Sequence, residues 1–269
     1  MNFFRRVLNL CSGFAGYRDV LDVTPGAALR YLAQLLTLLV VAFVVASVPW
    51  VRSRGEDVAR WYDQHGPAFR LQDGKVVTDI PQPFQAGDAK FQVRLDTTGQ
   101  VQTSALTAAQ GVLIAADSLS IWVRPAANTN QILLSSGHRL QGLPDGKVDG
   151  HYLRELLRIL LWVGVPMAVV GMLLVSFVGV LLQAWLFTLA ASFMERNAPG
   201  ALEFRQLLNL ALHAVTPGAI ILTVYAACRL EGIDLWLVYL IAYGIFLVGA
   251  TNACHRPAVP QESRDEDPF

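Results

Sequence analysis

Residues 31–51 read YLAQLLTLLVVAFVVASVPWV and carry no charged side chain. A helix of this length spans about 30 Å, which is the thickness of the hydrocarbon core of a bilayer. Arg30 and Arg52 bracket the stretch, and Thr24-Pro25-Gly26 supplies an N-cap and a proline for the first turn of a helix. The leader in front is longer than that of a secretory signal peptide. We therefore predict an uncleaved transmembrane anchor.

Three further stretches are also free of charge, at residues 159–194, 206–228 and 235–254. The first would measure about 54 Å as one helix, but it holds no polar turn that could divide it into two spans. One long helix is favoured over a broken or re-entrant one. The short connection at 229–234 predicts a hairpin of the last two spans. The expected fold is a membrane α-helical protein of four transmembrane helices, at 31–51, 153–196 and, as a hairpin, 203–254.

The composition agrees with a membrane protein. Of 269 residues, 54% are hydrophobic and 16% charged, and the mean hydropathy is +0.41. Soluble domains carry about 25% charged residues. The formal net charge is zero, so no nucleic-acid-binding surface is indicated. The expected partners are the lipid bilayer and a membrane protein or a second copy of the chain.

The placement of arginine predicts the orientation, because short cytoplasmic loops are rich in Lys and Arg. Four arginines precede the first span, and Arg196 and Arg205 lie between the second and third. Both termini are therefore expected in the cytoplasm, with residues 1–30 as an interfacial segment and residues 255–269 as a disordered tail. Residues 52–152 are expected outside.

Residues 52–152 have the sequence pattern of a small α+β domain inserted between helices 1 and 2. Asp73-Gly74 and Asp117-Ser118 each separate two short apolar runs and predict two β-hairpins. The segment holds no cysteine, so it must be stabilised by a core of its own.

The domain shows no recognisable catalytic motif. His65, His138 and His151 lack the close spacing of a metal-binding helix, and the chain has no nucleophile elbow, phosphate-binding loop or CxxC pair. An enzyme acting at the outer surface of the membrane would have few candidate residues, namely Asp57, Asp63 and His65. We predict no enzyme, no cofactor, no metal and no catalytic residue.

Polar residues at membrane depth are the strongest candidates for a site. Asn209, His213, Thr216 and Pro217 follow one another on the third span, and Asn209 and His213 share a helix face. Polar groups in lipid usually face protein or a water-filled cavity. Two interpretations stay open: these side chains join helices together, or they form a small intramembrane polar site.

Two short matches suggest an internal repeat. Residues 4–10 (FRRVLNL) match 204–210 (FRQLLNL) at most positions, and residues 23–27 (VTPGA) recur unchanged at 215–219. Chance similarity in leucine-rich sequence is one explanation. Duplication of an interfacial helix with its spanning helix is the other; residues 2–16 would then correspond to 203–213.

Several short motifs carry a family resemblance. They are Phe3-Phe4-Arg5, Asp73-Gly74-Lys75, Gln82-Pro83, Leu95-Asp96-Thr97-Thr98-Gly99 and Thr216-Pro217. This set resembles a bacterial integral membrane protein family of unknown function, some members of which are labelled maltodextrin-utilisation proteins. The resemblance implies a multi-pass protein of the bacterial plasma (inner) membrane with one extracytoplasmic domain, and it implies no catalytic residues.

The function expected from these observations is that of a non-enzymatic accessory protein of the inner membrane. Its extracytoplasmic domain would sense or bind a ligand or interact with a partner. The alternative is an oligomeric component of a solute transport system.

Overall fold

The computed structural model describes residues 2–99, 106–124, 132–135, 137–195, 201–230, 232 and 234–255. It divides into two compact units, which are described separately. The first unit consists of Met1–Val48 and Val165–Phe269, and the second of Pro49–Gly164. Residues 256–269, most of the predicted C-terminal tail, lie outside the described residues.

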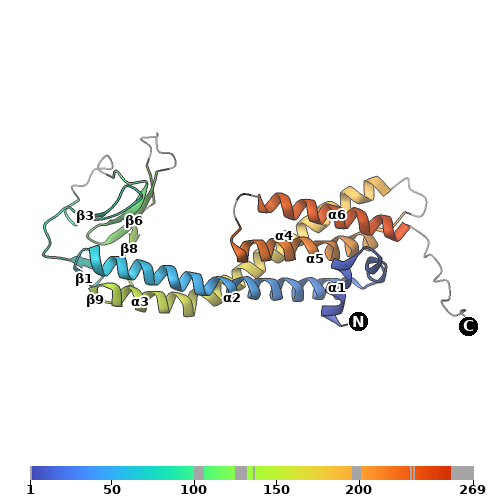
Figure 1. Ribbon diagram of the computed structural model, residues 1–269, viewed down its shortest axis with the longest axis horizontal. Helices are drawn as coiled ribbons and strands as arrows, with labels where there is room; N and C mark the ends of the chain where they lie inside the picture. Colours follow the sequence, from blue (N-terminus) through green and yellow to red (C-terminus); the bar gives the residue numbers. More distant parts are fainter. Residues whose placement is uncertain are drawn as a thin grey trace, which may run out of the picture. The chain divides into compact units, whose positions relative to one another are not determined.

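The first unit is helical. It contains α1 (Phe3–Ser12), a 3₁₀ helix η1 (Ala15–Val20), the first part of α2 (Pro25–His65), α4 (Val165–Glu195), α5 (Phe204–Cys228) and α6 (Leu235–His255). Helix α5 is its centre, because it packs against both α4 and α6 and is also contacted by α1 and η1 (Figure 1). Nearly every α5 side chain between Leu207 and Ala219 is buried.

Four helices in the described chain are long and apolar enough to cross a membrane, as the sequence predicted. Helix α2 is longer than residues 31–51 at both ends. It begins at Pro25, where the carbonyl and hydroxyl oxygens of Thr24 accept the free N–H of Ala27, and it continues past Pro49 to His65.

The second apolar run is helical from Gly150 to Glu195 in three consecutive elements: α3 (Gly150–Ile159), a π-helical segment η3 (Leu160–Gly164) and α4. The Asp149 carboxylate starts α3 by accepting from the N–H of Tyr152 at 3.0 Å. Pro166 has no N–H to donate to Trp162, four residues earlier, and the wider π turn lies immediately before it.

Helices α5 and α6 form the predicted pair. A capping box between Glu203 and Gln206 starts α5, and Arg229, in the left-handed region at φ 53°, ends it. The Asp234 carboxylate accepts from the first N–H groups of α6. Gly218 brings the two helices close, since a Cβ there would lie only 3.2 Å from Tyr239.

The second unit contains two sheets. The smaller has the order β2–β1–β9, from β1 (Phe69–Gln72), β2 (Lys75–Val77) and β9 (Gly146–Val148). The larger has the order β3–β4–β5–β6–β7, from β3 (Phe84–Gly87), β4 (Phe91–Leu95), β5 (Gln110–Ile114), β6 (Ser118–Val123) and β7 (Leu133–Leu134). Strand β8 (His138–Arg139) also pairs with β6.

Both predicted hairpins are confirmed. Strands β1 and β2 are antiparallel around Asp73 and Gly74, whose φ angles of 52° and 71° are those of a tight hairpin turn. Strands β5 and β6 are antiparallel around residues 115–117. The parallel pairing of β4 with β5 was not predicted.

The second unit has its own core, as expected for a segment without cysteine. Apolar side chains from both sheets form one cluster, which Trp61, Tyr62 and Tyr152 of the helices join. On the other face, Trp122 is completely buried against Gly111, Leu106 and Ala108. Any Cβ at residue 111 would collide with the Trp122 ring, so glycine is required there.

The two copies of the suggested repeat differ in local structure. Residues 4–10 belong to α1, which ends at Ser12, whereas residues 204–210 open a helix that continues to Cys228. The VTPGA sequence starts α2 in the first copy and lies inside α5 in the second. Gly13 and Gly16, which are weak helix formers, follow α1, whereas the second copy has no glycine between residue 210 and Gly218.

Candidate functional site

The first unit contains a cluster of polar side chains where α1, α2 and α5 meet, and all of them are buried except Arg6, which is half-buried. We define the buried polar cluster as Arg6, Tyr31, Asn209, His213 and Thr216. It includes three of the four sequence candidates, and the fourth, Pro217, is buried next to Thr216 on α5. The sequence candidates therefore lie in one place, together with two residues that the sequence did not indicate.

Asn209 connects α5 to the segment before α2. Its Nδ2 donates to the carbonyl oxygens of Val23 at 2.6 Å and Leu21 at 3.2 Å. These carbonyls lie between η1 and α2, where no helical N–H is available to them. One buried amide therefore satisfies two backbone acceptors and fixes the entry to the first apolar helix.

His213 is fully buried, and its two ring nitrogens differ in environment. Nδ1 lies 2.8 Å from the carbonyl oxygen of Asn209. A carbonyl oxygen can only accept, so Nδ1 carries the proton in this bond and Nε2 of the neutral ring is an acceptor. Within the described residues, Nε2 has no hydrogen-bond partner.

Tyr31 links the histidine to the rest of the cluster. Its ring stacks on His213, with ring centroids 4.6 Å apart, and its hydroxyl shares a 2.9 Å hydrogen bond with Thr216. The guanidinium of Arg6 lies 5.9 Å from the Tyr31 ring centroid. The Tyr31 ring therefore contacts both a cation of α1 and the imidazole of α5.

Sequence reasoning missed Tyr31 and Arg6. Along the sequence, Tyr31 is the first residue of an apolar span, and Arg6 is one of the arginines that predict the orientation. No spacing along the chain relates either residue to α5, so the sequence holds no signal that could have placed them beside His213.

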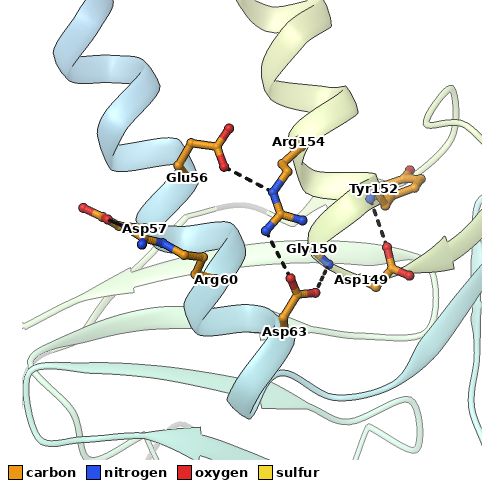
Figure 2. Close-up of polar contacts among 8 residues, drawn as sticks. All are labelled: Glu56, Asp57, Arg60, Asp63, Asp149, Gly150, Tyr152 and Arg154. Carbon is orange, nitrogen blue, oxygen red and sulfur yellow. Dashed lines mark hydrogen bonds and ion pairs between the residues drawn. The ribbon is translucent and has the colours of Figure 1, made fainter.

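The second unit contains a separate polar assembly between α2 and α3. We define the helix clamp as Glu56, Asp63, Gly150 and Arg154. Figure 2 shows Arg154 of α3 reaching the two carboxylates on α2. Its Nε lies 3.2 Å from Glu56, its terminal nitrogen lies 3.2 Å from Asp63, and Asp63 also accepts from the Gly150 N–H at 2.6 Å.

Two glycines allow this close approach of α2 and α3. A Cβ at Gly150 would collide with the Asp63 carboxylate, and one at Gly55 would collide with Leu157. Both clamp carboxylates are 41% exposed, so water screens their attraction to the Arg154 guanidinium. The close packing at the two glycines therefore determines most of how α2 and α3 fit together.

The candidate enzyme residues Asp57, Asp63 and His65 each have separate partners and do not form one group. Asp57 pairs with Arg60 at 2.6 Å on the same helix, and Asp63 belongs to the helix clamp (Figure 2). His65 stacks on Trp61. His138 lies exposed on β8, and His151 opens α3. Across the described ranges, no three His, Cys, Asp or Glu side chains are close enough to hold a metal ion.

Four apolar helices with a strand-containing segment inserted after the first are compatible with a multi-pass membrane protein. Residues 12–251 match the family described as protein of unknown function (DUF1189), and the chain belongs to that family. The expected membership of a family of unknown function is thus confirmed. Searches among curated proteins and among solved structures gave no match.

Proposed function

We propose that this protein is a non-enzymatic accessory protein of the bacterial inner membrane. In this proposal the second unit lies outside the cytoplasm and binds or senses a ligand or partner, while the apolar helices contact lipid and a membrane partner. The observation that carries the proposal is the surface of the helical run from Gly150 to Met194. In its most apolar stretch no side chain is buried.

The exposed surface of α4 contrasts with the buried surface of α5. Most of the apolar stretch of α5 is buried within the first unit, whereas α4 exposes Leu174, Val175 and Val178. Exposing such surface to water costs about 25 cal/mol for each Å². Lipid removes this cost, and a partner helix packed on the same surface does so as well.

The larger sheet of the second unit supports a binding role. Ile121 and Val123 alternate with the buried Trp122 and therefore lie on the opposite face, which they share with Val112 and Leu119 at the core, but they do not belong to the core cluster. Val123 is paired with Leu133. Ile121, Val123 and Leu133 are exposed, with Leu133 at 64%. Exposed apolar side chains gathered on one sheet face are typical of an interaction surface.

The helix clamp connects this sheet-containing unit to its helices. Strand β9 leads into α3 through the Asp149 cap, and α3 is bonded to α2 by Arg154 and Asp63. Within the second unit, the smaller sheet and both helices therefore form one bonded assembly. A partner bound to the unit can act on both helices together.

Site-specific photo-crosslinking in living cells tests the proposal. A photoreactive phenylalanine analogue would replace Leu133 on the outer unit or Val175 on α4, and Lys75, exposed on β2, is the matched control position. We expect a discrete adduct with a defined protein from one or both test positions and none from position 75. Absence of any protein adduct under several growth conditions would contradict the proposal.

The alternative, an oligomeric component of a solute transport system, draws support from the buried polar cluster and its acceptor nitrogen on His213. Reconstitution of the purified chain in vesicles distinguishes this alternative from an accessory protein. Solute flux that is lost in His213→Leu would favour transport, whereas absence of flux would exclude it.

A further inference from the structure

An open pocket of about 400 Å³ lies beside α3 in the second unit. Asp145 and Asp149, which precede the helix, line one part of it, and Glu155, Leu156 and Ile159 of α3 line another. We propose that this pocket binds the headgroup of a phosphatidylethanolamine molecule of the surrounding bilayer. The proposal rests on the function proposed above only in placing the apolar helical run in lipid.

The position of the pocket along α3 suits a lipid headgroup. Arg158 is the last charged residue before the charge-free run 159–194. With that run in lipid, Arg158 lies where the hydrocarbon meets the phosphate layer. Glu155 lies three residues, or about 4.5 Å, further from the hydrocarbon. Ile159 and Leu160, which are 50% and 60% exposed, begin the surface that acyl chains would contact.

Arg158 and Glu155 present opposite charges in the order in which the headgroup carries its own. In phosphatidylethanolamine the phosphate lies next to the glycerol and the ammonium lies beyond it. The guanidinium of Arg158 can therefore donate to the phosphate, while the carboxylate of Glu155 accepts from the ammonium.

The two side chains pair with each other, and this pair is easily exchanged. Nη1 of Arg158 lies 3.2 Å from Oε2 of Glu155, and the side chains are 69% and 43% exposed. Water screens such a surface pair, so its attraction contributes little. A bound zwitterion would give each side chain an opposite charge in place of the other.

The other charges of the lining favour an ammonium over an anion. Asp145, Asp149 and Glu155 contribute three carboxylates, against the single ammonium of Lys147. The first two carboxylates each accept a backbone N–H at 3.0 Å, and this bond leaves their negative charge in place. A phosphatidylglycerol headgroup has no cation to place beside these carboxylates.

The carbon wall of the pocket suits a lipid better than a soluble amine. Pro144, Tyr152 and Leu156 belong to the lining, and the Tyr152 hydroxyl donates to the carbonyl oxygen of Pro144 at 2.9 Å, which fixes the ring. The glycerol and the first acyl carbons can lie against Leu156 and Ile159. A soluble headgroup would leave these side chains uncovered.

Lipid retention by the full chain tests the proposal. Protein purified in mild detergent would be incubated with equal amounts of phosphatidylethanolamine and phosphatidylglycerol, and the bound lipids would be counted by native mass spectrometry. We expect phosphatidylethanolamine to predominate. Glu155→Gln should lower its retention about fivefold, which corresponds to about 1 kcal/mol, the upper end for a partly exposed ion pair.

Asp57→Asn is the matched control. Asp57 forms the same kind of pair with Arg60, three residues later on α2, and it does not line this pocket (Figure 2). The charge change equals that of Glu155→Gln, so retention of phosphatidylethanolamine should stay unchanged.

The double variant Glu155→Arg/Arg158→Glu tests the order of the charges. It keeps the net charge and the surface pair but reverses their order, so retention should fall at least as far as in Glu155→Gln while gel filtration shows the same profile. Unchanged retention in the double variant, or equal loss in Asp57→Asn and Glu155→Gln, would overturn the proposal.

Equal retention of phosphatidylglycerol, or of soluble glycerophosphoethanolamine at the same concentration, would also overturn it. Crosslinking from positions 133 and 175 does not depend on this pocket. Failure of the lipid proposal is therefore distinguishable from failure of the proposed function.

Discussion

The hydroxyl of Tyr31 on α2 shares a 2.9 Å hydrogen bond with the hydroxyl of Thr216 on α5, and the two residues are 185 positions apart in the chain. The Tyr31 ring also stacks on His213, one turn before Thr216. The first apolar helix is thus held to the third by a tyrosine at its start. This contact, together with Asn209, is the basis of the first two predictions.

Asn209→Leu should destabilise the first unit more than Tyr31→Phe does. The first change leaves the carbonyls of Leu21 and Val23 without their donor, and the second removes one hydroxyl bond. We expect a loss of about 1–3 kcal/mol for Asn209→Leu and about 0.6 kcal/mol for Tyr31→Phe. Thermal unfolding of the full chain in detergent measures both.

Thr223→Val is the control for this pair. Its hydroxyl bonds to Ala219 on its own helix, so its removal breaks no contact between helices. A larger loss for Tyr31→Phe than for Asn209→Leu would contradict the role assigned to Asn209.

His213→Leu should leave both the membrane level of the protein and its crosslinking pattern unchanged. Leucine has a similar volume, and the imidazole bonds only to a carbonyl of its own helix while its Nε2 has no partner in the described part of the chain. Immunoblotting and crosslinking from position 133 are the measurements. Loss of the crosslinked product at a normal protein level would instead identify the buried polar cluster as a functional site.

Asp63→Ala should loosen the helix clamp, because Asp63 binds both Arg154 and the N–H of Gly150. The ion pair is partly exposed and contributes little, so we expect a loss of about 1 kcal/mol, mainly from the backbone bond. Hydrogen exchange at the start of α3 should become roughly fivefold faster. Asp57→Ala, which breaks only the Asp57–Arg60 pair, should leave that exchange rate unchanged.

Stability of the second unit should depend on the ionisation of Asp88. Backbone N–H groups of Phe91 and Lys90 donate to its carboxylate, which holds its pKa below the ordinary value. Because the pKa of Asp88 is lower in the folded than in the unfolded chain, the ionised carboxylate stabilises the fold at a pH above its unfolded pKa of about 4. This stabilisation is lost as the pH falls below that value. Thermal unfolding between pH 2.5 and pH 6 should show that loss in the native chain and a smaller one in Asp88→Asn.

Orientation can be tested at Lys90, an exposed residue beside β4. Cys11, Cys228 and Cys254 are free thiols and must first be replaced. A cysteine introduced at position 90 should then react with an impermeant thiol reagent on intact spheroplasts, since the second unit is proposed to lie outside. Protection before lysis and reaction after it would show the opposite orientation.

The sequence predicted the features that depend on neighbouring residues. Charge-free stretches such as 31–51 predicted the four apolar helices because a bare charge is costly in hydrocarbon whatever its tertiary context. The Asp73-Gly74 turn predicted the β1–β2 hairpin because both positions tolerate positive φ angles, which is a local property of the backbone. The polar candidates on α5, Asn209, His213 and Thr216, were found because a polar side chain in an apolar helix can be recognised from the sequence of that helix alone.

The tertiary structure alone decided which distant groups meet. Tyr31 and Arg6 join His213, Arg154 reaches Asp63, and β4 pairs in parallel with β5. Each of these contacts depends on how separate elements pack, and the sequence between the partners places no geometric limit on that packing. Local preference and solvent therefore determined the elements of this protein, whereas side-chain complementarity between distant segments determined its polar cluster and its clamp.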